Sequence, residues 1–164
     1  MNRGYLKVAL LGMLLALALL CSYVETLIPI NFRIPGIKLG LANIVVVIAL
    51  YLVGRKEALL ISVARILLSG LLFGNMFAVV YSLAGGVLSF LVMVLLMTKG
   101  KLNIISVSAA GGIAHNLGQL VVAALVVENM NLIYYMSVLF FAGLLTGVLI
   151  GIVSREVIAR LRAV

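Results

Sequence analysis

Nearly all the charged residues of this chain lie between long apolar runs. Runs of roughly 17 to 25 apolar residues match the hydrocarbon core of a bilayer, because a helix rises about 1.5 Å per residue and must cover about 30 Å. With 66% hydrophobic and only 10% charged residues, the 164-residue chain cannot cover the surface of a soluble protein. The sequence therefore predicts an all-α integral membrane protein.

The apolar runs divide into six predicted transmembrane helices, which form a single domain over residues 1–164. The stretch 57–98 is too long for one crossing, and Gly74 and Asn75 mark its expected break. Pro29 and Pro35, the two prolines of the chain, predict a loop after the first helix. The expected helices cover about 8–24, 39–54, 57–73, 76–97, 104–127 and 133–154, and the expected outer capping loop covers 25–38.

The distribution of basic residues predicts the orientation, because Lys and Arg are retained on the cytoplasmic side. With the amino terminus inside, nine basic residues fall in cytoplasmic segments, whereas the outer loops hold only Arg33 and Lys38. We therefore expect both termini in the cytoplasm. The net charge of +8 is then a topogenic signal that also favours anionic lipid headgroups, and it does not indicate a nucleic-acid partner.

Arg65 is the most informative single position, because a charge near the middle of a membrane costs about 2.5 to 3.5 kcal/mol even on insertion scales. The chain has no Asp, and its four Glu residues fall at expected helix ends or in loops. No acid is therefore expected at the depth of Arg65. Two interpretations stay open: a bound ligand supplies the missing negative or acceptor group, or Arg65 is a structural residue satisfied by carbonyls and amides.

The fifth expected helix carries a polar stripe, because residues three or four positions apart share one face. Its members are Ser108, Gly111, Gly112, His115 and Gln119. The glycines leave room beside the polar groups, which predicts a ligand cavity. A hydrogen-bonded interhelical histidine is the alternative for His115, since one histidine alone is no metal site.

The predicted ligand-binding set extends beyond this stripe. Asn43 and Asn75 lie near the outer ends of expected helices and could equally be helix caps. The complete set is Arg65, His115, Asn116, Gln119, Asn43, Asn75 and Lys38.

Small residues at four-residue spacing predict close helix packing. Gly12 and Ala16 form such a face on the first helix, and Gly143, Gly147 and Gly151 form one on the sixth. Spacing alone leaves open whether the partner is another helix of this chain or another subunit.

Several short motifs occur in a characteristic order over most of the chain. They are residues 35–43 (PGIKLGLAN), 49–58 (ALYLVGRKEA), 65–68 (RILL), 72–75 (LFGN), 82–86 (SLAGG) and 114–119 (AHNLGQ). In this order they resemble the Gx transporter family, whose older description is heptaprenyl diphosphate synthase component I. That family is similar to the substrate-binding S components of energy-coupling factor (ECF) transporters.

The resemblance implies a six-helix subunit of the bacterial cytoplasmic membrane, with cytoplasmic termini and an outward-facing pocket beneath the loop 25–38. Gly12 and Ala16 occupy the place that docks the energy-coupling transmembrane subunit, which in turn binds the ATPases. The ligand would be a small organic molecule, with flavins, quinones and isoprenoid-like compounds as candidates, and no cofactor is implied.

The synthase description meets a chemical objection, because prenyl transfer uses paired Asp-rich motifs to hold magnesium and this chain has no Asp. It also lacks a phosphate-binding Walker loop. We therefore expect a protein that is not an enzyme. The favoured function is a substrate-binding transporter subunit, and the alternative is a non-catalytic scaffold or accessory subunit of a prenyl diphosphate synthase or a flavin/quinone redox assembly.

The charge bias yields a topology prediction. After Cys21 is replaced, a single cysteine at position 100 should be labelled from the cytoplasmic side and one at position 130 from the external side. The reason is that nine basic residues lie in the predicted cytoplasmic segments, one of which contains position 100. A membrane-impermeant maleimide applied to intact cells and to inverted vesicles measures this. External labelling at position 100 would overturn the orientation.

Overall fold

The computed structural model describes residues 3–27, 40–100 and 102–163, and within these ranges all regular structure is helical. The elements are α1 (Arg3–Leu27), α2 (Leu41–Leu52), α3 (Arg55–Phe73), α4 (Met76–Lys99), α5 (Ile104–Val126), the 3-10 helix η1 (Met130–Tyr135) and α6 (Met136–Arg162). Every expected helix is therefore present at nearly its predicted position.

Four helical stretches of the described chain are long and apolar enough to cross a membrane: α1, α4, α5 and η1 with α6. Helix α2 has only 12 residues. Helix α3 has 19 residues, and its charged side chains make it less apolar than the four. Length and composition confirm a multi-pass, all-helical membrane protein.

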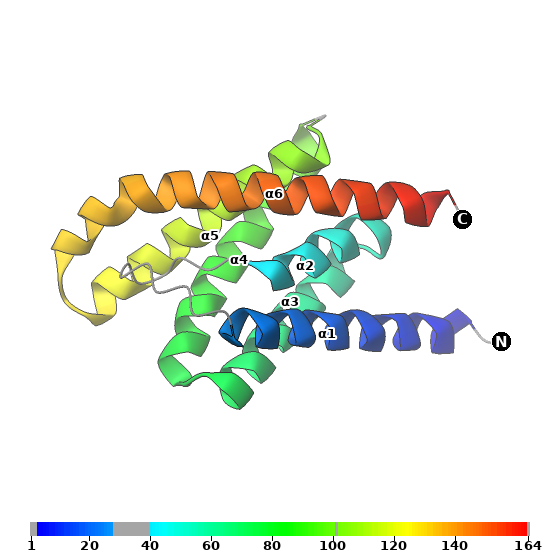
Figure 1. The fold of residues 1–164 in the computed structure, drawn as a ribbon, viewed down its shortest axis with the longest axis horizontal. Coiled ribbons are helices and arrows are strands. Elements are labelled where there is room, and N and C mark those ends of the chain that lie inside the picture. Colours follow the sequence, from blue (N-terminus) through cyan, green and yellow to red (C-terminus); the bar gives the residue numbers. More distant parts are fainter. Residues whose placement is uncertain (1–2, 28–39, 101, 164) are drawn as a thin grey trace.

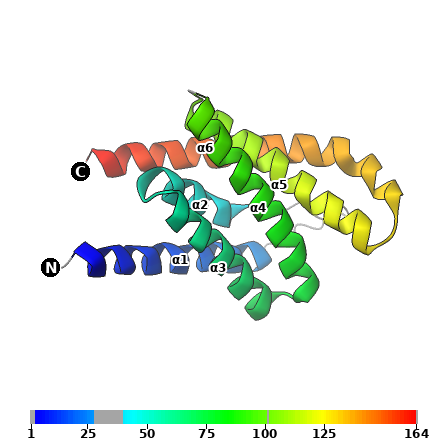
Figure 2. The same ribbon diagram turned by 180° about the vertical axis from the view of Figure 1, so that it is seen from behind.

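The helices pack as a bundle in which the two termini lie at the same end (Figures 1 and 2). Helix α1 contacts α2 and α3, and α2 also contacts α6. Helix α3 contacts α4, and α5 lies between α4 and α6. The α1 end and the α2 start, separated by twelve undescribed positions, meet through a hydrogen bond from the Gly40 amide to Glu25.

Helix α2 is shorter than the expected span 39–54 because a glycine with positive φ stands at each end. Gly40 has φ of 70° and Gly54 has φ of 136°, and L-residues with a side chain rarely adopt such angles. Helices α1 and α6 are instead longer than expected, since α6 continues through the basic residues to Arg162. Apolar runs predict the lipid-spanning part of a helix, whereas α1 and α6 extend past their apolar runs into charged segments.

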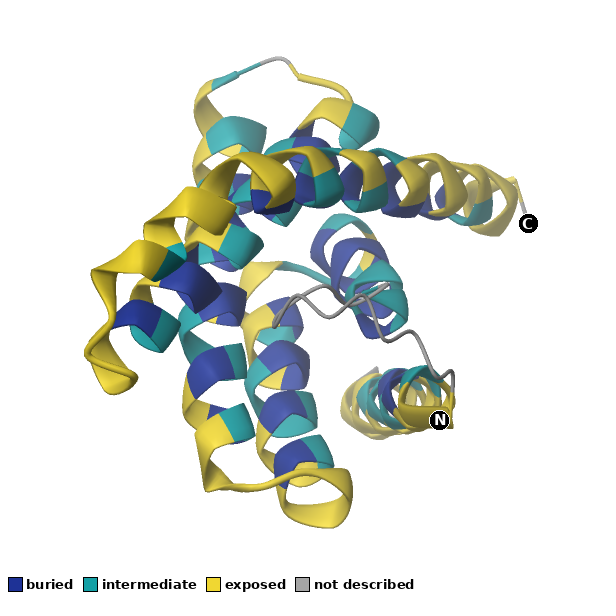
Figure 3. Cartoon of the chain, turned by 60° about the vertical axis from the view of Figure 1, so that its left-hand side comes forward, coloured by how far each residue is buried: buried dark blue, intermediate teal, exposed yellow. Residues whose placement is uncertain are grey.

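The core of the bundle forms around α2, most of whose apolar residues are buried (Figure 3). Its residues from Val45 to Leu50 are all buried, and Phe90, Met93 and Val107 pack in the same cluster. By contrast, α1 lies at the edge of the bundle and is largely exposed (Figure 3). A short, mostly apolar helix can therefore occupy the centre, because its neighbours shield it.

The glycines of α6 face α5 of the same chain, which settles the alternative that spacing left open. A Cβ atom added to Gly147 would lie 2.6 Å from the Ser108 carbonyl oxygen, and one added to Gly143 would lie 2.6 Å from the Gly112 carbonyl oxygen. The Ser108 hydroxyl also donates to the Gly147 carbonyl oxygen at 2.7 Å. In lipid, such close backbone approach replaces the hydrophobic effect as the source of helix association.

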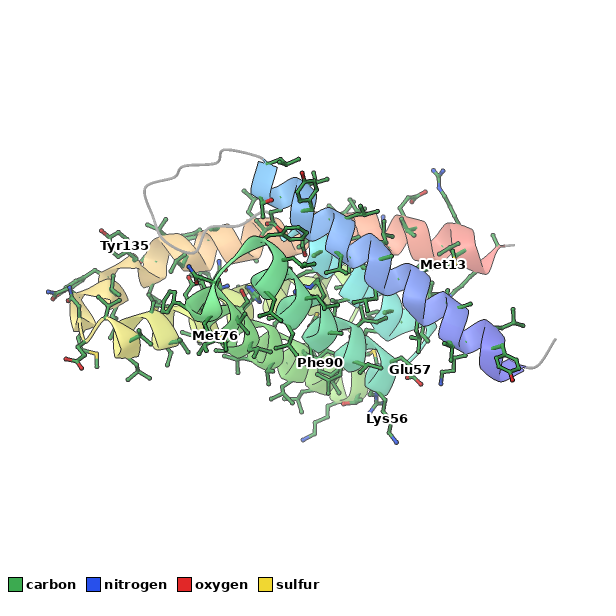
Figure 4. All side chains as sticks on the ribbon, turned by 90° about the horizontal axis from the view of Figure 1, so that it is seen from below. Met13, Lys56, Glu57, Met76, Phe90 and Tyr135 are labelled. Carbon is green, nitrogen blue, oxygen red and sulfur yellow. The ribbon has the colours of Figure 1, made fainter. Side chains whose placement is uncertain are left out.

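Polar contacts join the helices at the end of the bundle where both chain termini lie. Lys7 on α1 forms an ion pair with Glu57 in the first turn of α3, where Figure 4 labels Lys56 and Glu57. The Arg162 guanidinium donates to the Tyr51 carbonyl oxygen at 3.2 Å, which joins the α6 end to the α2 end. Tyr135 lies toward the opposite end of the molecule (Figure 4).

The α5–α6 contact predicts a difference between two glycines. Gly147→Ala should lower the free energy of unfolding by about 1 to 3 kcal/mol, because the new methyl group meets backbone atoms that cannot move aside. Gly12→Ala is the matched control, since nothing lies within 4 Å of its added Cβ. Thermal unfolding of both variants in detergent, followed by size-exclusion chromatography, measures the difference. Equal stability would contradict the tight α5–α6 interface.

Candidate functional site

A small cavity of about 30 Å³ lies where α2, α5 and α6 meet. Its lining residues are Gly40, Asn43, Gly112, His115, Asn116, Thr146 and Ile150. Polar side chains are rare in this apolar chain, so their collection around one cavity inside a helix bundle is the expected form of a ligand site. The volume suits one functional group, because whole drug-sized ligands need about 300 to 1,000 Å³.

Arg65 reaches the wall of this cavity through Asn43. The Arg65 Nη2 atom donates to Asn43 Oδ1 at 3.2 Å, which joins the middle of α3 to the first turn of α2. Asn43 itself lines the cavity. The structure thus brings together Arg65, Asn43, His115 and Asn116, four of the residues that the sequence selected.

Against the expectation that no acid shares the depth of Arg65, one acid lies within electrostatic range of it, although the two side chains form no ion pair in the described structure. Glu25, in the last turn of α1, interacts electrostatically with Arg65. Its Oε1 atom accepts a hydrogen bond from the Gly40 amide at 2.6 Å. The expectation failed because α1 continues to Leu27 and packs against α3, so that a helix-end acid faces the interior.

Asn116 and Thr146 line the α5–α6 side of the cavity. The Asn116 Nδ2 atom donates to the Leu139 carbonyl oxygen on α6 at 2.8 Å. The Thr146 hydroxyl donates to the Ala142 carbonyl oxygen one turn earlier on its own helix, at 2.9 Å. Both side chains are therefore held in place by backbone acceptors, as a preformed binding site requires.

His115 and Gln119 also lie against α4. A Cβ atom added to Gly85 would lie 3.1 Å from His115 Cε1 and 2.7 Å from Gln119 Cγ. Gln119 is only 2% exposed, and its amide has no hydrogen-bond partner among the described residues. It does not line the cavity. The polar stripe of α5 therefore divides: His115 reaches the cavity, and Gln119 packs between α5 and α4.

Asn75 lies apart from this cavity. Asn75 is the N-cap of α4, where its side chain accepts a hydrogen bond from the Ala78 amide at 2.8 Å. That is the cap alternative considered for it from the sequence. Lys38 and most of the expected capping loop fall outside the described residues.

The small-residue face of α1 is exposed in the described structure. Gly12 and Ala16 are both exposed, and no atom lies within 4 Å of a Cβ added to Gly12. The other small-residue face, on α6, is fully used inside the bundle. Of the two faces, only that of α1 is available to another protein or to lipid.

The sequence did not predict four contributors to the site: Glu25, Gly40, Thr146 and Ile150. Glu25 could be recognised in the sequence as the acid that precedes the proline-containing loop, but only the packing of α1 shows which way its side chain faces.

A second cavity of about 170 Å³ lies between α5, η1 and the start of α6. Its lining is wholly apolar, from Leu117 to Met136, so it offers no group that would orient a ligand.

Fold and site together define a multi-pass helical membrane protein with a small polar cavity in its interior. The model of one family, heptaprenyl diphosphate synthase component I, matches residues 14–157, and the chain belongs to that family. No curated protein and no solved structure matches the chain. The description of the family names a component of a synthase and assigns no chemistry to a residue.

Proposed function

We propose that this chain is the membrane-embedded substrate-binding subunit of an ECF-type transporter. It would cross the bacterial cytoplasmic membrane six times with both termini inside, and it would present the cavity to the outer side. The observation that carries the proposal is the cluster of polar side chains around the cavity, with Arg65 bound to one of them. Polar groups inside a membrane bundle are costly, and a bound substrate would repay that cost.

The exposed face of α1 supports the same proposal. Gly12 and Ala16 would let the backbone of an energy-coupling transmembrane subunit approach closely, and that subunit would recruit the ATPases. ATP chemistry would then belong to the partners, because this chain has no Walker loop.

The family description favours a second candidate, a non-catalytic component of a prenyl diphosphate synthase. In this function the chain would hold a soluble catalytic subunit at the membrane, where the apolar product accumulates. The chain would supply no magnesium-binding Asp pair, since it contains no Asp. Copurification separates the candidates: a transporter subunit retains a stoichiometric small molecule or captures ATPase partners, whereas a scaffold captures a prenyl synthase.

The central test concerns Arg65. Arg65→Ala should leave expression and monodispersity near wild type, while the amount of copurified small molecule falls by about tenfold, the scale of one charge-assisted hydrogen bond. Arg65→Lys should restore only part of the small-molecule occupancy, because the lysine ammonium keeps the positive charge but lacks the planar guanidinium with its several N–H donors. Native mass spectrometry of gently solubilised protein measures the occupancy.

Arg55→Ala is the matched control, because it removes a cation of the same helix that is exposed at the first position. It should retain the small molecule at wild-type occupancy. Misfolding of Arg65→Ala, combined with full retention by His115→Ala and Asn43→Ala, would make Arg65 structural and favour the synthase component.

The α1 face gives a separate prediction. Gly12→Leu combined with Ala16→Leu should weaken capture of an energy-coupling subunit and leave the fold and ligand retention unchanged, because both positions face outward. Pull-down from detergent-solubilised membranes measures the capture. Leu20→Ala, a change at another exposed α1 position, serves as the control. If the double variant captured the energy-coupling subunit as well as wild type, this face of α1 would not be the docking surface.

A further inference from the structure

The cavity has one cation and one anion beside it among the described residues. Arg65 is one hydrogen bond from the wall, through Asn43 Oδ1 at 3.2 Å. Glu25 is also one hydrogen bond from the wall, through the Gly40 amide at 2.6 Å. His115 is the other titratable side chain that lines the cavity. Among the described residues beside the cavity, the Glu25 carboxylate therefore offsets the formal charge of the Arg65 guanidinium.

We propose that Glu25 is the resident counter-ion of this site and that the group which a ligand places in the cavity is uncharged. The inference rests on the proposed function, and it names the class of substrate. In a low-dielectric interior an added anion would be repelled by Glu25 and an added cation by Arg65. A neutral group is repelled by neither side chain and leaves the opposite charges of Glu25 and Arg65 in balance.

The hydrogen-bonding capacity of the wall narrows this class further. The hydrogen bonds of the described residues use Asn43 Oδ1 and Asn116 Nδ2, which leaves the Asn43 Nδ2 donor and the Asn116 Oδ1 acceptor for a ligand. Thr146 directs its proton to its own helix and can still accept. The cavity is thus matched to a compact group that both accepts and donates, such as a carboxamide, an imide or a hydroxyl.

The test identifies what the protein retains and what Glu25 does to it. Wild type, Glu25→Gln, Glu25→Asp and Glu128→Gln are purified in mild detergent, bound masses are recorded by native mass spectrometry, and the released molecule is identified after denaturation. Glu128 is an exposed acid in the turn after α5, so its variant is the matched control. Glu25→Asp keeps the charge if Glu25→Gln fails to fold.

We expect wild type, Glu128→Gln and Glu25→Asp to retain a molecule without a carboxylate, phosphate or ammonium group. Glu25→Gln leaves Arg65 uncompensated, so its occupancy by that molecule should fall by about tenfold or an anionic species should replace it. A carboxylate- or phosphate-bearing molecule in wild type would overturn the inference and leave the transporter proposal standing. Wild-type retention by Glu25→Gln would likewise overturn the role of Glu25. A wild-type protein without any small molecule would overturn the proposed function itself.

Discussion

The close approach of α5 to its two neighbours is the constraint on which the rest of this bundle depends. In lipid the hydrophobic effect does not drive helices together, so association relies on backbone contact through small residues. Gly118 brings α5 against α4, where an added Cβ would lie 2.8 Å from the Ala84 carbonyl oxygen, and Gly147 brings α6 against α5. Helix α5 is held on both faces, and its polar residues are therefore fixed in direction.

That arrangement explains why a polar cavity can exist at the point where α2, α5 and α6 meet. Asn116 is held by the Leu139 carbonyl oxygen, and Asn43 is held by Arg65. Helix α2 is short and enclosed, so its first turn can carry Gly40 and Asn43 into the interior. The cost of burying these groups is offset in part by the bonds they make to one another and to the backbone.

Electrostatic balance is the second feature that packing creates. Glu25 and Arg65 belong to different helices and lie 40 positions apart in the sequence. They interact because the end of α1 lies against α3. A lone intramembrane arginine would call for an anionic ligand, whereas an arginine with a nearby acid suits a neutral one. The chemistry expected of the ligand thus depends on a tertiary contact.

Much of the fold follows from the sequence, because a helix in lipid must satisfy its backbone internally and expose apolar side chains over a fixed length. Apolar runs and the Gly-Asn break at 74–75 predicted six helices, and all six are present, although α1 begins five residues earlier and α6 ends eight residues later than expected. Arg65, Asn43, His115 and Asn116 were selected as polar exceptions within these helices. Periodicity could not tell that Gln119 turns toward α4 or that Asn75 caps a helix, since a shared face does not identify the helix that covers it. The sequence by itself determined which segments become helices and which residues are costly to bury. Only the tertiary structure decided that the α6 glycines face α5, that the α1 face stays open and that Glu25 accompanies Arg65, because those outcomes depend on contacts between helices far apart in the chain.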